Sequence, residues 1–168
     1  MTAWWWDVPE FVEAQQDENF QAWVQMVDLR VDLEGVAGII PNLPGSPFAE
    51  SALPIAEQAL LDTFHDRSAW MTDETRSTSF EFVGYFGEFY RHNLEAKWVN
   101  QPEVEQRGWY QPGPALEFPW DKISLFDVLG LVRAAVIRRT GTEFSRLYAN
   151  NRKAYLAWVE AGRPPVAE

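Results

Sequence analysis

The residues with the clearest chemical potential lie in one aromatic run. Phe82–Glu88 ends on a carboxylate where an apolar residue would be expected, and Trp98 follows ten residues later. Gly84 and Gly87 interrupt the run, and each costs about 1 kcal/mol in helix propensity. We expect these two structural glycines to let another helix or a sheet approach closely.

Glu88 is predicted to be buried with its aromatic neighbours. A buried carboxylate without partners costs several kcal/mol of stability. We therefore expect Glu88 to be structural, with hydrogen bonds from the backbone or an aromatic side chain, or with an arginine as its ion-pair partner. The side chains that could serve are Trp98, Tyr110, Arg91 and Arg138.

A metal site is the chemical alternative for the same carboxylate. On a helix, Glu81, Glu88, His92 and Glu95 fall close to one face, at spacings of seven, four and three residues. A carboxylate and an imidazole at i and i+4 can share a metal ion, and Glu95 can complete three ligands. Such pairs are also frequent on solvated helix faces, so the sequence predicts no cofactor.

Composition places the chain among small globular proteins. Its 168 residues predict one domain, and nine tryptophans and eleven phenylalanines supply a large core. The absence of cysteine excludes disulfides, cysteine-based zinc sites and thiol chemistry. The N-terminal residues lack a secretory pattern, and the longest apolar stretch, 123–137, is too short for a bilayer. We expect a soluble, cytoplasmic protein without membrane contact.

The net charge of −11 is distributed unevenly along the chain. Residues 1–75 hold fourteen acids against two arginines, whereas residues 76–168 hold eleven acids and twelve bases. The two halves can face each other, pair two copies into a homodimer, or offer an acidic face to a basic partner or mimic nucleic acid. The overall charge repels phosphates, so no nucleic-acid partner is expected.

The first 96 residues are predicted to form several helices with one loop between them. Asp7 and Glu10 form an acidic capping box for the first helix. Glycines and prolines concentrate in 35–50, which predicts an ordered loop. Three further helices are expected to begin at Asp17, Ser51 and Thr72, the last extending to about Ala96.

Trp4 and Trp5 have no structural explanation in the sequence. Trp6 precedes the capping box and can pack against Phe11 as a hydrophobic staple. Trp4 and Trp5 either fold back on the core or form an exposed aromatic patch for a partner. They are therefore our candidate interaction residues.

The segment 97–120 differs from the helical segments before it in its sequence pattern. Short aromatic stretches split by glycine and proline predict a small antiparallel sheet at about residues 97–119. A nearly all-apolar helix, expected to be the central buried one, follows at 124–139, and a last helix starts after Thr142. Asn151 interrupts the apolar stripe of that last helix, either as a structural core amide or as a ligand-facing residue.

These elements predict an α+β fold, a predominantly helical domain with one small antiparallel sheet before two C-terminal helices. A single globular domain over 1–168 is expected. Its parts are N-terminal helices and a loop (1–45), central helices (46–96), the sheet (97–120) and a C-terminal helical pair (121–161).

Three short motifs together resemble a known family. They are Ser46-Pro47-Phe48 with Leu53, Glu57 and Leu60-Leu61; Gly87-Glu88 with nine residues before Trp98; and Arg138-Arg139-Thr140-Gly141. This combination resembles a group of small actinobacterial proteins of unknown function with a Gly-Glu-x9-Trp signature. The resemblance covers roughly residues 46–150, and it implies a compact α+β fold and no activity. That family tends to have a Gly-Gly pair before the tryptophan, where this chain has Glu95 and Ala96.

The sequence contains no motif that indicates catalysis. It predicts a non-catalytic protein-interaction or regulatory module, comparable to inhibitors and immunity proteins, with a protein partner of unknown identity. The alternative is a small-molecule- or metal-binding protein that uses Glu88 and His92, or aromatic residues of the sheet. Those aromatic residues are Trp109, Tyr110 and Trp120.

Overall fold

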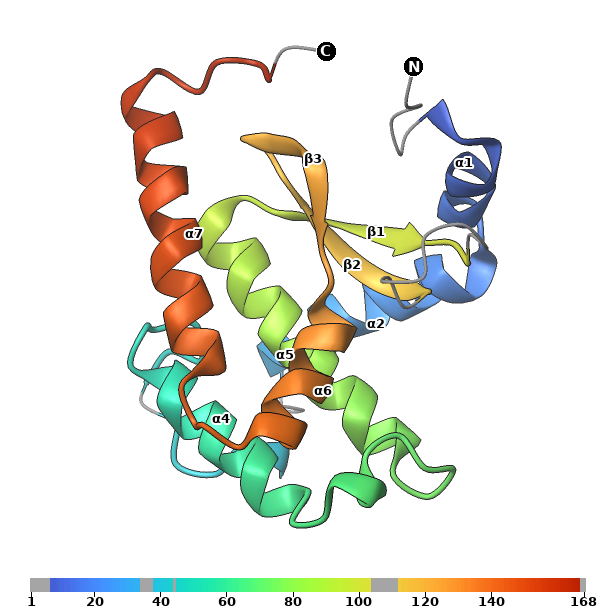
Figure 1. The fold of residues 1–168 in the computed structure, drawn as a ribbon, viewed down its shortest axis with the longest axis vertical. Coiled ribbons are helices and arrows are strands. Elements are labelled where there is room, and N and C mark those ends of the chain that lie inside the picture. The colour runs from blue at the N-terminus through green and yellow to red at the C-terminus, as the bar shows by residue number, and fades with distance from the viewer. Residues whose placement is uncertain (1–6, 34–37, 44, 104–111, 167–168) are drawn as a thin grey trace.

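The computed structural model describes residues 7–33, 38–43, 45–103 and 112–166. Its helices are α1 (Pro9–Gln15), α2 (Glu18–Leu33), α4 (Ala52–Thr63), α5 (Arg76–Leu94), α6 (Val128–Arg138) and α7 (Glu143–Glu160), with a 3-10 helix at Arg67–Ala69. Its strands are β1 (Lys97–Gln101), β2 (Gly113–Phe118) and β3 (Asp121–Phe126). The predicted α+β fold, mostly helical with one small antiparallel sheet, is confirmed (Figure 1). None of the helices in the described ranges is long and apolar enough to cross a membrane.

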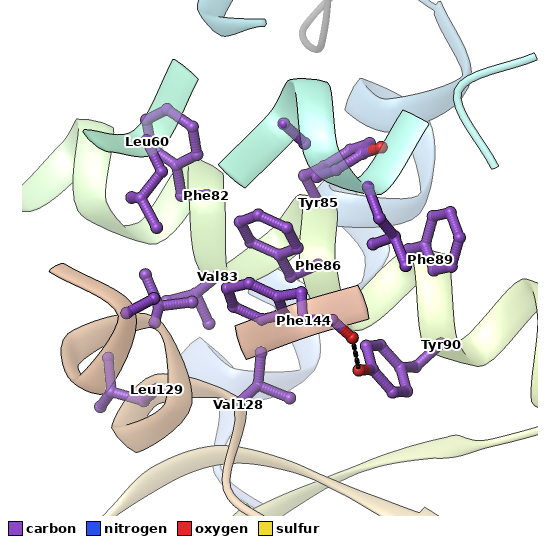
Figure 2. Close-up of a cluster of buried hydrophobic side chains, with 14 of the residues drawn as sticks. Leu60, Phe82, Val83, Tyr85, Phe86, Phe89, Tyr90, Val128, Leu129 and Phe144 are labelled. Carbon is purple, nitrogen blue, oxygen red and sulfur yellow. Dashed lines mark hydrogen bonds between the residues drawn. The ribbon is translucent and has the colours of Figure 1, made fainter. Parts of the chain in front are cut away.

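The central helix is α5, which is buried on every side along its middle. Residues 82–90 are all buried, as expected of a helix without a solvent-facing side. Phe86 stacks on Phe144 of α7 with ring centroids 3.5 Å apart, and the Tyr90 hydroxyl donates to the Phe144 carbonyl oxygen (Figure 2). The prediction that the apolar helix now seen as α6 would be central is wrong, because α6 buries one face and leaves Ile137 39% exposed.

The sheet is covered on both faces. Its strands are ordered β1-β2-β3, and Trp98 pairs directly with Leu116 across β1 and β2. Successive side chains of a strand point to opposite faces. Trp98 and Leu116 therefore join the main core, whereas their neighbours Val99 and Ala115 form a second cluster with Phe11 of α1.

Helix α1 also closes the exposed edge of β1 with polar contacts. The Gln15 side chain accepts a hydrogen bond from Asn100 N (2.8 Å) and donates one to Asn100 O (2.7 Å). The Asn100 side chain donates to Ala14 O (3.0 Å). These bonds satisfy strand groups that would otherwise offer an edge to another chain.

Two predicted helix starts differ from the structure. Asp7 and Glu10 form no capping box, because α1 begins after Val8, which has no side-chain cap. The helix expected from Thr72 begins instead at Arg76. Thr72 lies in the preceding turn, where its carbonyl oxygen accepts a hydrogen bond from Arg76 N (2.8 Å).

The last strand lies later in the chain than predicted. We expected all strands before residue 120 and the next helix from Ser124, whereas Asp121–Phe126 forms β3. Helix α6 starts only after Asp127, whose Oδ1 accepts a hydrogen bond from Gly130 N (2.8 Å). The cap at Asp127 therefore separates an extended segment from a helix within one apolar stretch.

Gly87 marks the closest approach of α5 and the sheet. A Cβ atom at Gly87 would collide with the indole ring of Trp98, which is itself buried. We expect Gly87→Ala to lower the free energy of unfolding by about 1–3 kcal/mol, as overpacked core substitutions do. Chemical denaturation measures the change. Gly45→Ala is the matched control, because nothing lies within 4 Å of its Cβ position, and an equal effect of both substitutions would contradict this packing.

Candidate functional site

Glu88 is fully buried and is held by two donor side chains. Nε1 of Trp98 donates to Oε1 at 2.6 Å. Arg91 donates from Nε to Oε1 at 2.9 Å and from Nη2 to Oε2 at 2.7 Å. Two of the partners expected from the sequence, Trp98 and Arg91, are therefore present. These charge-assisted bonds meet the requirement of a buried carboxylate for close donors.

Arg91 connects this cluster to α2. Its Nη2 lies 2.5 Å from Oδ1 of Asp28, an α2 residue whose side chain is 55% exposed. Nε2 of His92 lies 3.4 Å from Oε2 of Glu88, and the imidazole stacks on Phe48 with centroids 4.0 Å apart. One buried carboxylate thus links α5, β1 and α2.

The cluster meets the distance requirement for a metal site but already contains a cation. Ligand atoms of Asp28, Glu88 and His92 all lie within 4.8 Å of one another. The Arg91 guanidinium, however, donates to both carboxylates. A metal ion would have to displace it and leave an arginine without its buried partner, which is costly. The geometry favours an ion-pair cluster over a metal centre.

Two other predicted ligands lie outside this cluster. Glu81 pairs with Arg30 of α2 at 3.3 Å. Glu95 accepts hydrogen bonds from Arg163 (2.7 Å) and from the Tyr155 hydroxyl (2.8 Å), and these bonds hold the pKa of Glu95 below its ordinary value. Glu95 adopts a left-handed conformation (φ 54°), so the turn before Trp98 forms without a glycine.

A second buried carboxylate, Glu57, caps the start of α7. Its Oε1 accepts from Glu143 N (3.0 Å) and its Oε2 from Phe144 N (3.1 Å). Burial raises the pKa of Glu57, while the two N–H donors act in the opposite direction. We did not predict this role from the sequence. The signal that could have revealed it is an acid inside the apolar stripe of a helix.

A cavity of about 480 Å³ lies between α2 and α5. Its apolar wall consists of Trp23, Met26, Val27, Ile39, Phe80 and Gly84. Its polar residues are Arg30, Asp73, Arg76, Ser77 and Glu81. The helices meet beside the cavity, where a Cβ atom at Gly84 would lie 3.3 Å from a Val27 methyl group. Gly84 thus has the close-packing role expected of it.

The outer face of α2 exposes apolar side chains. Met26 is 54% exposed and Leu29 is 59% exposed, and Ala22 is also exposed. Spacings of four and three residues place these three on one side of the helix. We call Ala22, Met26 and Leu29 the α2 face.

Among the described residues, the remaining predicted sites do not line the cavity between α2 and α5. Asn151 is half-buried on α7, and both roles considered for it stay predictions. Trp120 stacks on Phe118 with centroids 4.5 Å apart and packs near Tyr155 and Trp158. The other aromatic candidates lie outside the described residues: Trp4, Trp5, Trp109 and Tyr110.

No family model, curated protein or solved structure matches this chain. The resemblance to small actinobacterial proteins therefore stays a prediction. Because a fold alone does not define an activity, the functional argument depends on the geometry of the sites.

Replacing the buried carboxylate tests the Glu88 cluster. In Glu88→Gln, an amide N–H₂ group faces the Arg91 donors or Trp98 Nε1, and a charge-assisted pair is lost. We expect the free energy of unfolding to fall by about 2–4 kcal/mol. Denaturant titration measures this change, and Asp28→Asn on the exposed side is expected to cost less than about 1 kcal/mol. A rise in melting temperature with divalent metal ions that disappears in His92→Ala would contradict the ion-pair assignment.

The raised pKa of Glu57 predicts a pH dependence of stability. A carboxyl whose pKa is raised on folding stabilises the protein below its ordinary value of 4.5, and this contribution is lost as pH rises through the folded pKa. We therefore expect the free energy of unfolding of the wild type, relative to Glu57→Gln, to decrease as the pH rises above the ordinary value of 4.5. Denaturation at several pH values measures the difference. Glu160→Gln, at an exposed position, is the control, and a difference that grows with pH at Glu57 would contradict the prediction.

Proposed function

We propose that this protein is a non-catalytic interaction module that binds a protein partner through the α2 face. The observation that carries this proposal is the exposed apolar side of α2, with Met26 and Leu29 both more than half exposed. Single exposed apolar residues are ordinary, but adjacent ones on one helix face are typical of binding surfaces.

The buried carboxylates support binding over catalysis. A general acid or base must come within hydrogen-bond reach of its substrate. Glu88 and Glu57 are fully buried, and each is already bonded to groups of the protein itself. Their bonds account for the two acids inside the core in structural terms.

Charge indicates the kind of partner. Glu18 is exposed on α2, and the first 75 residues carry a large excess of acids. Asp28, also exposed on α2, is already paired with Arg91. A partner with an apolar patch rimmed by lysine or arginine would complement this helix. A second copy joined through the same face would bring like charges together, so the proposal favours a different protein over a homodimer.

Substitution within the α2 face tests the proposal. Leu29→Lys adds a charge to the face without changing the core, because this side chain is already 59% exposed. We expect affinity capture from the source cells to recover a stoichiometric partner with the wild type and to lose it at least about tenfold with Leu29→Lys. Quantitative mass spectrometry measures the loss.

Val12→Lys is the matched control, since Val12 is 52% exposed on α1, away from the α2 face. It should retain the partner. A Trp4→Ala/Trp5→Ala variant tests the other predicted surface in the same experiment. If the partner depends on the two tryptophans and not on Leu29, the assignment to α2 is wrong. Size-exclusion chromatography separates both outcomes from self-association.

A further inference from the structure

We infer that the cavity between α2 and α5 is a binding site for a small, uncharged and mostly apolar molecule. This goes beyond the proposed interaction, because it concerns the cavity between α2 and α5. Met26, at the rim of that cavity, is the one residue of the α2 face that also lines it. The cavity volume of about 480 Å³ lies within the range of roughly 300–1,000 Å³ that small-molecule sites occupy.

The walls have the chemistry of a site for an aromatic or aliphatic body. Trp23 and Phe80 meet edge to face, with centroids 6.3 Å apart, and both are only partly buried. Met26 lies beside them with a flexible side chain that can adapt to different shapes. Binding here would remove apolar surface of both ligand and protein from water.

Rigid contacts hold the two walls in place. Val27 packs against Gly84, and Trp23 meets Trp98 edge to face with centroids 4.9 Å apart. Trp98 is fixed in turn by its hydrogen bond to buried Glu88. The space between the helices is thus bordered by the most constrained contacts of α2, so it is largely formed before a ligand enters.

The charges around the cavity are balanced in pairs. Arg30 lies 3.3 Å from Glu81, and Arg76 lies 3.5 Å from Asp73. An anionic ligand would approach the two carboxylates as well as the two arginines, and a cationic ligand would meet the reverse arrangement. Burying a charge without its own partner is costly. An uncharged ligand avoids that cost, and the Ser77 hydroxyl is available on the wall for a hydrogen bond.

Two fluorescent probes with the same ring system test the inference on the full chain. N-phenyl-1-naphthylamine is uncharged, and 1-anilinonaphthalene-8-sulfonate adds one negative charge. We expect the uncharged probe to bind saturably at one molecule per chain, with increased fluorescence. The sulfonated probe should bind at least about tenfold more weakly. Equal affinity for both probes, several probes per chain, or no saturable binding would overturn the inference.

Substitutions at the cavity wall locate the bound probe. Met26→Phe on α2 and Ser77→Phe on α5 place larger side chains at the cavity from opposite helices, and both positions are exposed, so folding should be retained. Each should weaken binding of the uncharged probe by about tenfold or more. Leu29→Phe and Ala149→Phe add the same ring at exposed positions outside the cavity and should change the affinity by less than about twofold. Unchanged affinity in both wall variants overturns the site.

The two proposals fail in different ways. Leu29→Lys leaves the cavity wall untouched, so partner loss with unchanged probe binding supports the interaction face independently of the cavity. Probe binding that depends on Ser77 while no partner depends on Leu29 supports the cavity and overturns the interaction face.

Discussion

The enclosed middle of α5 forces every neighbouring element to meet a helix that has no side open to water. Such a helix can be covered by apolar side chains, except where Glu88 introduces a charge. Two side chains donate hydrogen bonds to this carboxylate: Trp98 from β1, and Arg91 from the last turn of α5 itself. Because Arg91 also reaches Asp28 of α2, one carboxylate sets the distance between the central helix, the sheet and α2. Gly87 follows from the same constraint, since only a glycine leaves room for the indole that carries the donor.

Glu57 performs a related task at the other side of the core. The first N–H groups of a helix lack intrahelical partners, and the start of α7 is buried at Glu143 and Phe144, where water cannot satisfy them. Glu57 supplies acceptors from α4. Arg139, which follows α6, satisfies acceptors at the end of α4. Its guanidinium donates to the carbonyl oxygens of Leu61, in the last turn of α4, and of Phe64, the residue after that helix. Helix ends, and not only apolar faces, therefore decide how α4, α6 and α7 meet.

The sequence predicts the local parts of this design better than the distant ones. An acid in an aromatic run, with an indole ten residues later, was enough to place Trp98 and Arg91 among the expected partners of Glu88, and both donate to it. Asp17 likewise caps α2, with Oδ1 2.7 Å from Phe20 N. The Glu57 contact joins residues 86 positions apart, a pairing that no local pattern encodes. The central helix was misassigned because apolar content favours α6, whereas α5 is enclosed by its neighbours despite its glycines and glutamate. β3 was missed because its residues continue directly into the apolar stretch of α6, with only Asp127 to separate them.

The distribution of polar partners also bears on the two proposals that concern α2. Glu88 bonds α5 to β1 through Trp98, and Glu57 bonds α4 to the start of α7, which fixes how these elements meet. Helix α2 shares in that network through Asp28, next to the Val27–Gly84 contact. Its inner side packs Phe20, Trp23 and Val24 against the core and borders the cavity. Met26 lies at the cavity rim, and Leu29 is exposed on the outer side. In both proposals, the binding energy comes from apolar surface that α2 leaves uncovered, at the cavity and on its outer side. A small molecule in the cavity and a protein on the α2 face would each cover part of this apolar surface.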